Sequence, residues 1–440
     1  MPREDCLNLN TIRPAGLRAR RKLPVLVWIC GGGFTQGPNA DPAWNLSYVI
    51  RESVQQEQPI IGVAINYRLS FLGFPAGIQA MNAGITNLGF KDQRLALQWL
   101  QENIAAFGGD PDRVTIRGES AGAVGVSAQL VAYGGQKNSN PFRAAILHSG
   151  FLTGFTIFRT APLFQPSYDA LVANLSCSNH PNTLTCLRAA PVESIYKAQN
   201  QVTLPLLQWG PLVDGDFIKR APVFEMNDGR VVRVPIMLGN NVDEGFWAID
   251  FANGHPNTTD DIRHYFNAYV PALPSAAVEA LLEAYPENAP APPFSLPPDF
   301  PWCQTVRAAN TTCGAQERRV AAMLGDTVFD AARLFMARGW AKQGLKAYSY
   351  RFDATPRSLP LKYQFPQGRW FSTHGVEMSY SLGLPRDYVA GNPDTVPVRD
   401  VPGHVALSRN MVSRMIAFVH TLDPNPPKSR HGRCLVISLW

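Results

Sequence analysis

The strongest chemical signal in the sequence is a serine with a glycine two residues away on each side. Residues 118–122 read Gly-Glu-Ser-Ala-Gly, with Ser120 at the centre, and they follow the short β-type run 113–117. The next segment, 121–133, begins with small residues and can form a helix. A strand that turns sharply into a helix lifts the hydroxyl out of the sheet, and the glycines relieve the crowding in such a turn. The pattern predicts that Ser120 is a nucleophile; the alternative is an ordinary turn of small residues.

Three consecutive glycines at 31–33 follow the apolar run 24–30. Glycines let the backbone approach a substrate closely and point N–H groups at one place. Acyl transfer needs such donors where negative charge develops on the carbonyl oxygen. The N–H of Ala121, directly after the candidate nucleophile, is a further donor of this kind. No Lys-Ser/Thr pair follows the glycines, so the sequence does not support a phosphate-binding loop.

An acid and a base should follow the nucleophile, in that order along the chain. The apolar run 234–239 leads to two neighbouring carboxylates, Asp243 and Glu244, and their spacing alone favours neither. Among the histidines beyond that point, His374 and His404 lie in loop-like sequence, which can hold a base at the mouth of a sheet. The residues by themselves favour His374 only slightly.

Short apolar runs rich in Val and Ile, several without polar alternation, recur along the chain and alternate with helical patterns. This arrangement predicts an α/β fold in which a mostly parallel sheet is buried between helices. We expect one catalytic domain over residues 1–440, with a helical insertion around 245–345 that includes a proline-rich stretch at 284–302. The expected strands lie at 24–30, 59–66, 113–117, 142–147, 232–239 and 346–352, and helices at 91–106, 121–133 and 407–420.

Composition and cysteine usage limit the possible partners and the compartment. The 440 residues are 45% hydrophobic and 17% charged, and the net charge of +6 comes without a dense basic run, so nucleic acid is not the expected partner. No apolar stretch is long enough to cross a bilayer. The N-terminus lacks the apolar core of a secretory signal. Closely spaced cysteines and four Asn-x-Ser/Thr sites nevertheless favour a secreted protein; these are the pairs Cys177–Cys186 and Cys303–Cys313, and Asn45, Asn174, Asn257 and Asn310.

The sequence resembles the type-B carboxylesterase/lipase family, which includes cholinesterases and secreted fungal lipases. Matching motifs occur in order through nearly the whole chain. They lie at 4–10, 23–37, 66–69, in an unbroken block over 87–122, and at 214–216, 243–245 and 423–426. The resemblance implies an α/β-hydrolase fold, hydrolysis of a small-molecule or lipid ester through an acyl-enzyme, and no metal or organic cofactor.

The resemblance also resolves the two open choices. It implies that the acid is Glu244 and the base is His374. It further implies an oxyanion hole and two supporting side chains, namely Gly32, Gly33 and Ala121 for the oxyanion, and Glu119 and Ser149 beside the triad.

The chain departs from the family pattern at three places. Cys30 stands where the family usually has His or Tyr beside the glycine loop. The family normally carries a further N-terminal segment with the first strands and a lid loop, and this loop forms a disulfide with the position of Cys6. The family's C-terminus also differs from residues 428–440 here, which include Cys434. We therefore expect a truncated form. The alternatives to an esterase are an inactive fragment or a non-catalytic binding module on the same scaffold, and the presence of all three triad residues favours the enzyme.

Overall fold

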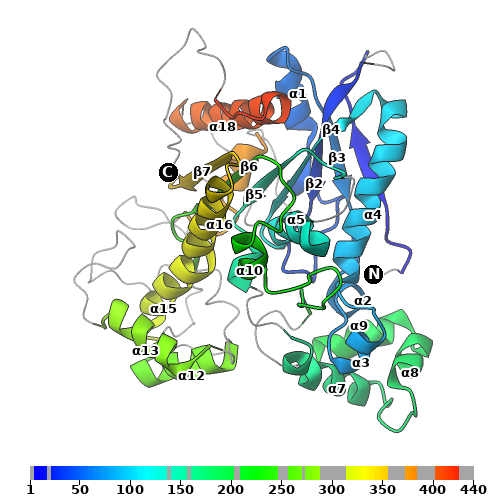
Figure 1. The fold of residues 1–440 in the computed structure, drawn as a ribbon, viewed down its shortest axis with the longest axis vertical. Coiled ribbons are helices and arrows are strands. Elements are labelled where there is room, and N and C mark those ends of the chain that lie inside the picture. The colour runs from blue at the N-terminus through cyan, green and yellow to red at the C-terminus, as the bar shows by residue number, and fades with distance from the viewer. Residues whose placement is uncertain are drawn as a thin grey trace.

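A seven-stranded sheet forms the centre of the computed structural model (Figure 1). The structure describes residues 4–16, 21–135, 140–155, 160–202, 209–245, 256–269, 273–287, 314–354, 372–383 and 402–425. The strand order is β1-β3-β2-β4-β5-β6-β7, and all neighbours are parallel except β1 and β3. The strands are β1 (Leu9–Ile12), β2 (Leu23–Ile29), β3 (Ile61–Ile65), β4 (Gly109–Glu119), β5 (Ala144–His148), β6 (Ile236–Asn241) and β7 (Ala347–Phe352).

The inner strands of the sheet are buried on both faces, and β2, β3, β5 and β6 are buried throughout. Every residue of β2 is buried. Val25, Val27 and Ile29 belong to the core on one face, whereas Leu26 and Trp28 belong to the core on the other. Helices must therefore cover both faces, as expected for a parallel sheet.

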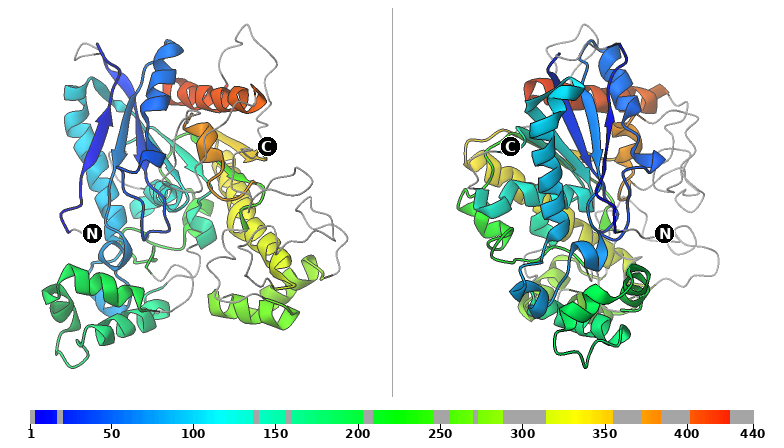
Figure 2. Two further views of the ribbon diagram at one scale, coloured as in Figure 1. Left: turned by 180° about the vertical axis from the view of Figure 1, so that it is seen from behind. Right: turned by 90° about the vertical axis from the view of Figure 1, so that its right-hand side faces the viewer.

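Two helical layers provide this cover (Figures 1 and 2). On one face lie α4 (Leu88–Asn103), α5 (Ala121–Val131) and α16 (Ala331–Lys342). On the other face lie α1 (Ser47–Gln55), α17 (Glu377–Ser381) and α18 (Pro402–Thr421). The predicted strands and the three predicted helices thus occur, with boundaries that differ by a few residues.

Within the expected insertion, three helices share a hydrophobic core of their own, separate from the sheet. These are α12 (Thr259–Tyr269), α13 (Ser275–Ala284) and α15 (Glu317–Leu324), which lie below the sheet in Figure 1. A π-helical turn, η5 (Gly325–Asp330), continues α15 into α16, and α16 packs against the sheet. One continuous helical segment therefore links this group to the main core.

A second helical group, also below the sheet in Figure 1, packs on the main core. It contains α7 (Gln165–Asn174), α8 (Thr183–Ala189) and α9 (Val192–Asn200). Within the described residues, the other short elements are η1 (Pro42–Trp44), α2 (Ser70–Gly73), α3 (Ile78–Asn82), η2 (Ile104–Phe107), η3 (Ala132–Gly135), α6 (Leu152–Phe155), η4 (Pro162–Phe164) and α10 (Pro222–Asn227).

Candidate active site

Ser120 sits on a strained turn between β4 and α5. Its backbone has φ 55° and ψ −128°, in the positive-φ region that non-glycine residues rarely adopt. A Cβ on Gly118 would lie 2.4 Å from the carbonyl carbon of Gly122, and one on Gly122 would lie 2.1 Å from the carbonyl oxygen of Ile29. Both flanking glycines are therefore required by close backbone contacts. The sharp turn from strand to helix that the sequence predicted is present, and it places Ser120 at the carboxyl end of β4.

Ser120, His374 and Glu244 form one hydrogen-bonded chain. Nε2 of His374 lies 2.8 Å from Oγ of Ser120, and Nδ1 lies 2.6 Å from Oε2 of Glu244. When Nδ1 carries the proton, it donates to the carboxylate, and the serine hydroxyl donates to Nε2. This is the geometry of a nucleophile, a base and an orienting acid.

The alternative acid and base lie elsewhere. Asp243 accepts a hydrogen bond from the backbone of Ser372, and Nδ1 of His404 lies 2.5 Å from the hydroxyl of Tyr380. The second carboxylate oxygen of Glu244 accepts the N–H of Asn241 at 2.7 Å, which fixes the rotamer that faces the imidazole. The structure thus brings Glu244 and His374 to Ser120.

The glycine loop lies directly against the nucleophile. A Cβ on Gly31 would lie 2.6 Å from the carbonyl oxygen of Glu119 and 3.2 Å from Cβ of Ser120. Gly32 and Gly33 follow with φ of 106° and 62°. Among the hydrogen bonds of the described residues, none uses the N–H of either glycine as donor. Both N–H groups are therefore available to bind an oxyanion.

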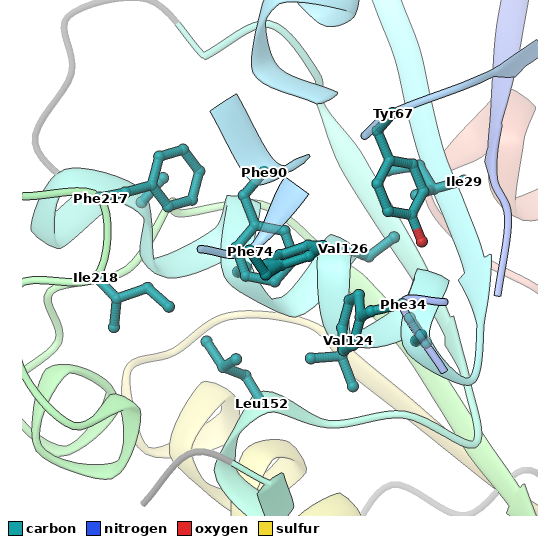
Figure 3. Close-up of a cluster of buried hydrophobic side chains, with 14 of the residues drawn as sticks. Ile29, Phe34, Tyr67, Phe74, Phe90, Val124, Val126, Leu152, Phe217 and Ile218 are labelled. Carbon is teal, nitrogen blue, oxygen red and sulfur yellow. The ribbon is translucent and has the colours of Figure 1, made fainter. Parts of the chain in front are cut away.

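Phe34 anchors this loop in the core. Its ring packs against Phe74 and Phe90, with centroid distances of 4.8 and 5.8 Å (Figure 3). On the strand side, the hydroxyl of Tyr67 donates a 2.7 Å hydrogen bond to the carbonyl oxygen of Cys30. Cys30 itself is buried and forms no disulfide, and its backbone carbonyl receives this support.

Carboxylates dominate the electrostatics around His374. Burial alone would lower the pKa of His374, but the nearby charges of Glu244, Glu119 and Glu377 outweigh burial and raise it to about 9. Oε1 of Glu119 lies 3.4 Å from Nε2, on the side of the imidazole that faces Ser120. The site therefore stabilises the imidazolium that forms when the histidine takes a proton.

Glu377, which the residue-by-residue reasoning did not single out, completes this carboxylate cluster. Its side chain accepts hydrogen bonds from Ser149 Oγ at 3.2 Å and from the amide of Asn241. Burial, with a smaller contribution from Glu244, raises the pKa of Glu377 to about 7. No local pattern in the sequence indicates this role, because its partners Ser149 and Asn241 lie 228 and 136 positions away along the chain.

Arg117, an unusual residue for a buried strand end, belongs to a polar network under the site. Its Nε donates to Nε2 of His148 at 3.0 Å, and its Nη2 donates to Oγ of Ser381 at 2.6 Å. Because arginine only donates, Nδ1 of His148 must carry the proton and donate to the hydroxyl of Tyr350, 2.5 Å away. Burial and the charge of Arg117 hold the pKa of His148 well below its usual value. The backbone oxygen of the same histidine accepts the N–H of Ser120 at 2.9 Å, so this network adjoins the nucleophile turn.

The other predicted features lie away from the triad. Cys177 and Cys186 form a disulfide between α7 and α8, and Cys6 is free. Of the predicted glycosylation sites, Asn174 and Asn257 are exposed and Asn45 is half-buried. Asn310, Cys303, Cys313 and Cys434 lie outside the described residues.

A model of the carboxylesterase family matches residues 2–433. The chain belongs to this family. It is 38% identical to secreted lipase 1 of Botryotinia fuckeliana over 96% of this chain and 69% of that protein. It is 35% identical to the secreted triacylglycerol lipase LIP1 of Gibberella zeae, over 98% of this chain and 68% of that protein. Among solved structures, Aspergillus niger EstA superposes with a TM-score of 0.79 at 26% identity, over 98% of this chain and 77% of EstA.

Family, fold and geometry agree on the class of reaction. The sheet order and the helical layers are those of an α/β-hydrolase, and the esterase is a carboxylic ester hydrolase. Within the described ranges, no helix has both the length and the apolar character needed to cross a membrane.

Proposed function

We propose that the esterase hydrolyses carboxylic esters through an acyl-enzyme on Ser120. The observation that carries this proposal is the hydrogen-bonded chain from Ser120 through His374 to Glu244, with distances of 2.8 and 2.6 Å. His374 Nε2 removes the hydroxyl proton while Oγ attacks the ester carbonyl carbon. Glu244 keeps Nδ1 protonated and compensates the positive charge of the imidazolium.

The glycine loop and the start of α5 supply the oxyanion hole in this mechanism. The N–H groups of Gly32, Gly33 and Ala121 bind the negative oxygen of the tetrahedral intermediate. His374 then protonates the departing alcohol. In the second step, His374, oriented by Glu244, takes a proton from a water molecule, which attacks the acyl group and releases the acid from Ser120. Glu119 and Ser149 assist, Glu119 by its charge beside the imidazole and Ser149 by its hydrogen bond to the buried Glu377.

The substrates we propose are esters of fatty acids, including acylglycerols. The support is the similarity over most of the chain to fungal proteins named as secreted lipases. We also propose that the esterase acts outside the cell. The disulfide between Cys177 and Cys186 and the exposed Asn174 and Asn257 suit that location. Expression in a secreting fungal host followed by endoglycosidase treatment tests it, since an unchanged mass would contradict glycosylation at these asparagines.

The decisive experiment compares the wild-type chain with Ser120→Ala on p-nitrophenyl butyrate and on a tributyrin emulsion. We expect both activities in the wild type and a fall to background in the variant. Circular dichroism of both samples checks that they are folded. Equal rates in wild type and variant would remove Ser120 as the nucleophile, and a folded wild-type chain without activity would favour a non-catalytic binding role.

A further inference from the structure

Two hydrogen bonds join Asp243 to the loop that carries His374. The backbone N–H of Asp243 donates to the carbonyl oxygen of Ser372 at 3.0 Å. In return, the N–H of Ser372 donates to Oδ2 of the Asp243 carboxyl, also at 3.0 Å. Both residues are buried, so water does not compete for either hydrogen bond. We call residues 242–244 the acid loop and residues 372–374 the base loop. The two loops are thus paired one residue before Glu244 and two residues before His374.

Other contacts dock the same loop on the sheet but do not involve the residue beside the acid. Oγ of Ser372 donates to the carbonyl oxygen of Phe352 at 3.0 Å, at the end of β7. The amide of Asn241 donates to the carbonyl oxygen of Thr373 at 2.7 Å. Asp243 and Asn241 therefore both tie residues 372–374 to the segment from which Glu244 projects, and Asp243 is the one directly beside Glu244.

The two neighbouring carboxylates have different partners because they point in different directions. Glu244 faces the imidazole, and Asp243 faces the backbone at Ser372. Burial raises the pKa of Asp243 to about 7 and the hydrogen bond from Ser372 opposes this rise; among the charges around it, Asp353 and Glu244 raise the pKa and Arg351 lowers it. A buried carboxyl is costly unless it is hydrogen-bonded, and the Ser372 N–H supplies such a bond. Its oxygen accepts the Ser372 N–H whether or not the group is ionised.

We propose that Asp243 is a positioning residue for ester hydrolysis, which keeps His374 in register with Glu244 and Ser120 by pairing with Ser372. The inference rests on the proposed function of these three residues. Loss of the carboxyl acceptor removes one of the hydrogen bonds that hold residues 372–374, and the imidazole then drifts from the 2.8 Å contact with Ser120 Oγ. A displacement of about 1 Å at a reacting group costs on the order of 100-fold in rate.

The test compares Asp243→Ala with Asp243→Asn. Asparagine presents a carbonyl oxygen at the same place and keeps the acceptor without the charge, whereas alanine removes the acceptor. We expect Asp243→Ala to lower kcat about 10- to 100-fold with little change in KM, and Asp243→Asn to recover most of that loss. Asp112→Ala, which removes an exposed carboxylate at the start of β4, is the matched control. Thermal melting of each variant separates a misplaced histidine from an unfolded chain.

A second readout does not depend on activity. The proton shared by His374 Nδ1 and Glu244 gives a downfield resonance in the proton NMR spectrum, which is assigned by its absence from His374→Ala. We expect it in the wild type and in Asp243→Asn, and we expect its loss or marked broadening in Asp243→Ala. Activity of Asp243→Ala within twofold of wild type, equal losses in both variants, or an unchanged resonance in Asp243→Ala would each overturn the proposal. A wild-type chain that shows the resonance but no turnover would overturn the proposed function alone.

Discussion

Replacing Glu119 with glutamine removes a negative charge from beside His374, the proposed base, and should lower the pKa of that histidine. The charge lies 3.4 Å from Nε2 of His374. At an effective dielectric constant of about 20, this distance corresponds to about 5 kcal/mol, or between about 3 and 4 pKa units. The amide dipole of glutamine replaces part of this interaction, and Glu244 still faces the imidazole. We therefore expect the pKa of His374 to fall by about 1 to 2 units from its raised value.

The pH dependence of kcat/KM on p-nitrophenyl butyrate measures this change. The base works only when deprotonated, so activity is lost as the pH falls through the pKa of His374. In the wild type, the half-point of this limb should lie above 6.5 and toward about 9. Glu119→Gln should move it downward, so that the variant retains more of its own maximal rate at pH 6. Glu193→Gln, at an exposed position on α9, is the control. A half-point that stays within about 0.3 units of wild type would refute the electrostatic argument.

Three further changes test other parts of the structure. Glu244→Gln uses its one oxygen to accept the Asn241 N–H, so its NH2 group faces Nδ1 of His374 and donates to it. The imidazole proton then lies on Nε2, the wrong nitrogen for a base, and kcat should fall about 10⁴-fold with a small change in KM, as steady-state kinetics would measure. Phe34→Ala leaves a cavity under the glycine loop, and we expect it to lower the free energy of unfolding by about 3–5 kcal/mol, as urea titration would measure, and to lower kcat. A free energy of unfolding within about 1 kcal/mol of wild type would contradict the anchoring role. Replacing both Cys177 and Cys186 by alanine opens a short loop between α7 and α8 and should lower that free energy by about 2–3 kcal/mol while leaving kcat unaltered.

The sharp turn at Ser120 could be predicted from the sequence because its geometric requirements lie within five residues. The glycines at 118 and 122 are both needed by backbone contacts of less than 3 Å, and the strand and helix around them carry clear patterns. The buried strands were predictable for a similar reason, since their apolar runs have no polar face. By contrast, β1 (Leu9–Ile12) is four residues long and only partly buried, and its pattern does not differ from that of a loop.

The choice between Asp243 and Glu244 could not be made from spacing. Both follow β6 at nearly the same distance, and the direction of each side chain depends on the turn between them. Only the resemblance to a family favoured Glu244, and the structure then places that carboxylate 2.6 Å from His374. Glu377 and Arg117 illustrate a second limit. Their roles depend on partners more than 200 residues away, such as Ser149 for Glu377 and Ser381 for Arg117, and no local pattern contains that information.

The contacts that assemble the triad also affect how the chain reaches its native state. The hydrogen bonds from His374 to Ser120 and to Glu244 join residues 254 and 130 positions apart. Closing loops of this length has an entropic cost that must be met before the contacts form, and such distant pairings slow folding. On refolding from urea, ester hydrolysis should therefore return later than the helical circular dichroism signal. Recovered activity is thus a stricter criterion of native structure for this chain than recovered secondary structure.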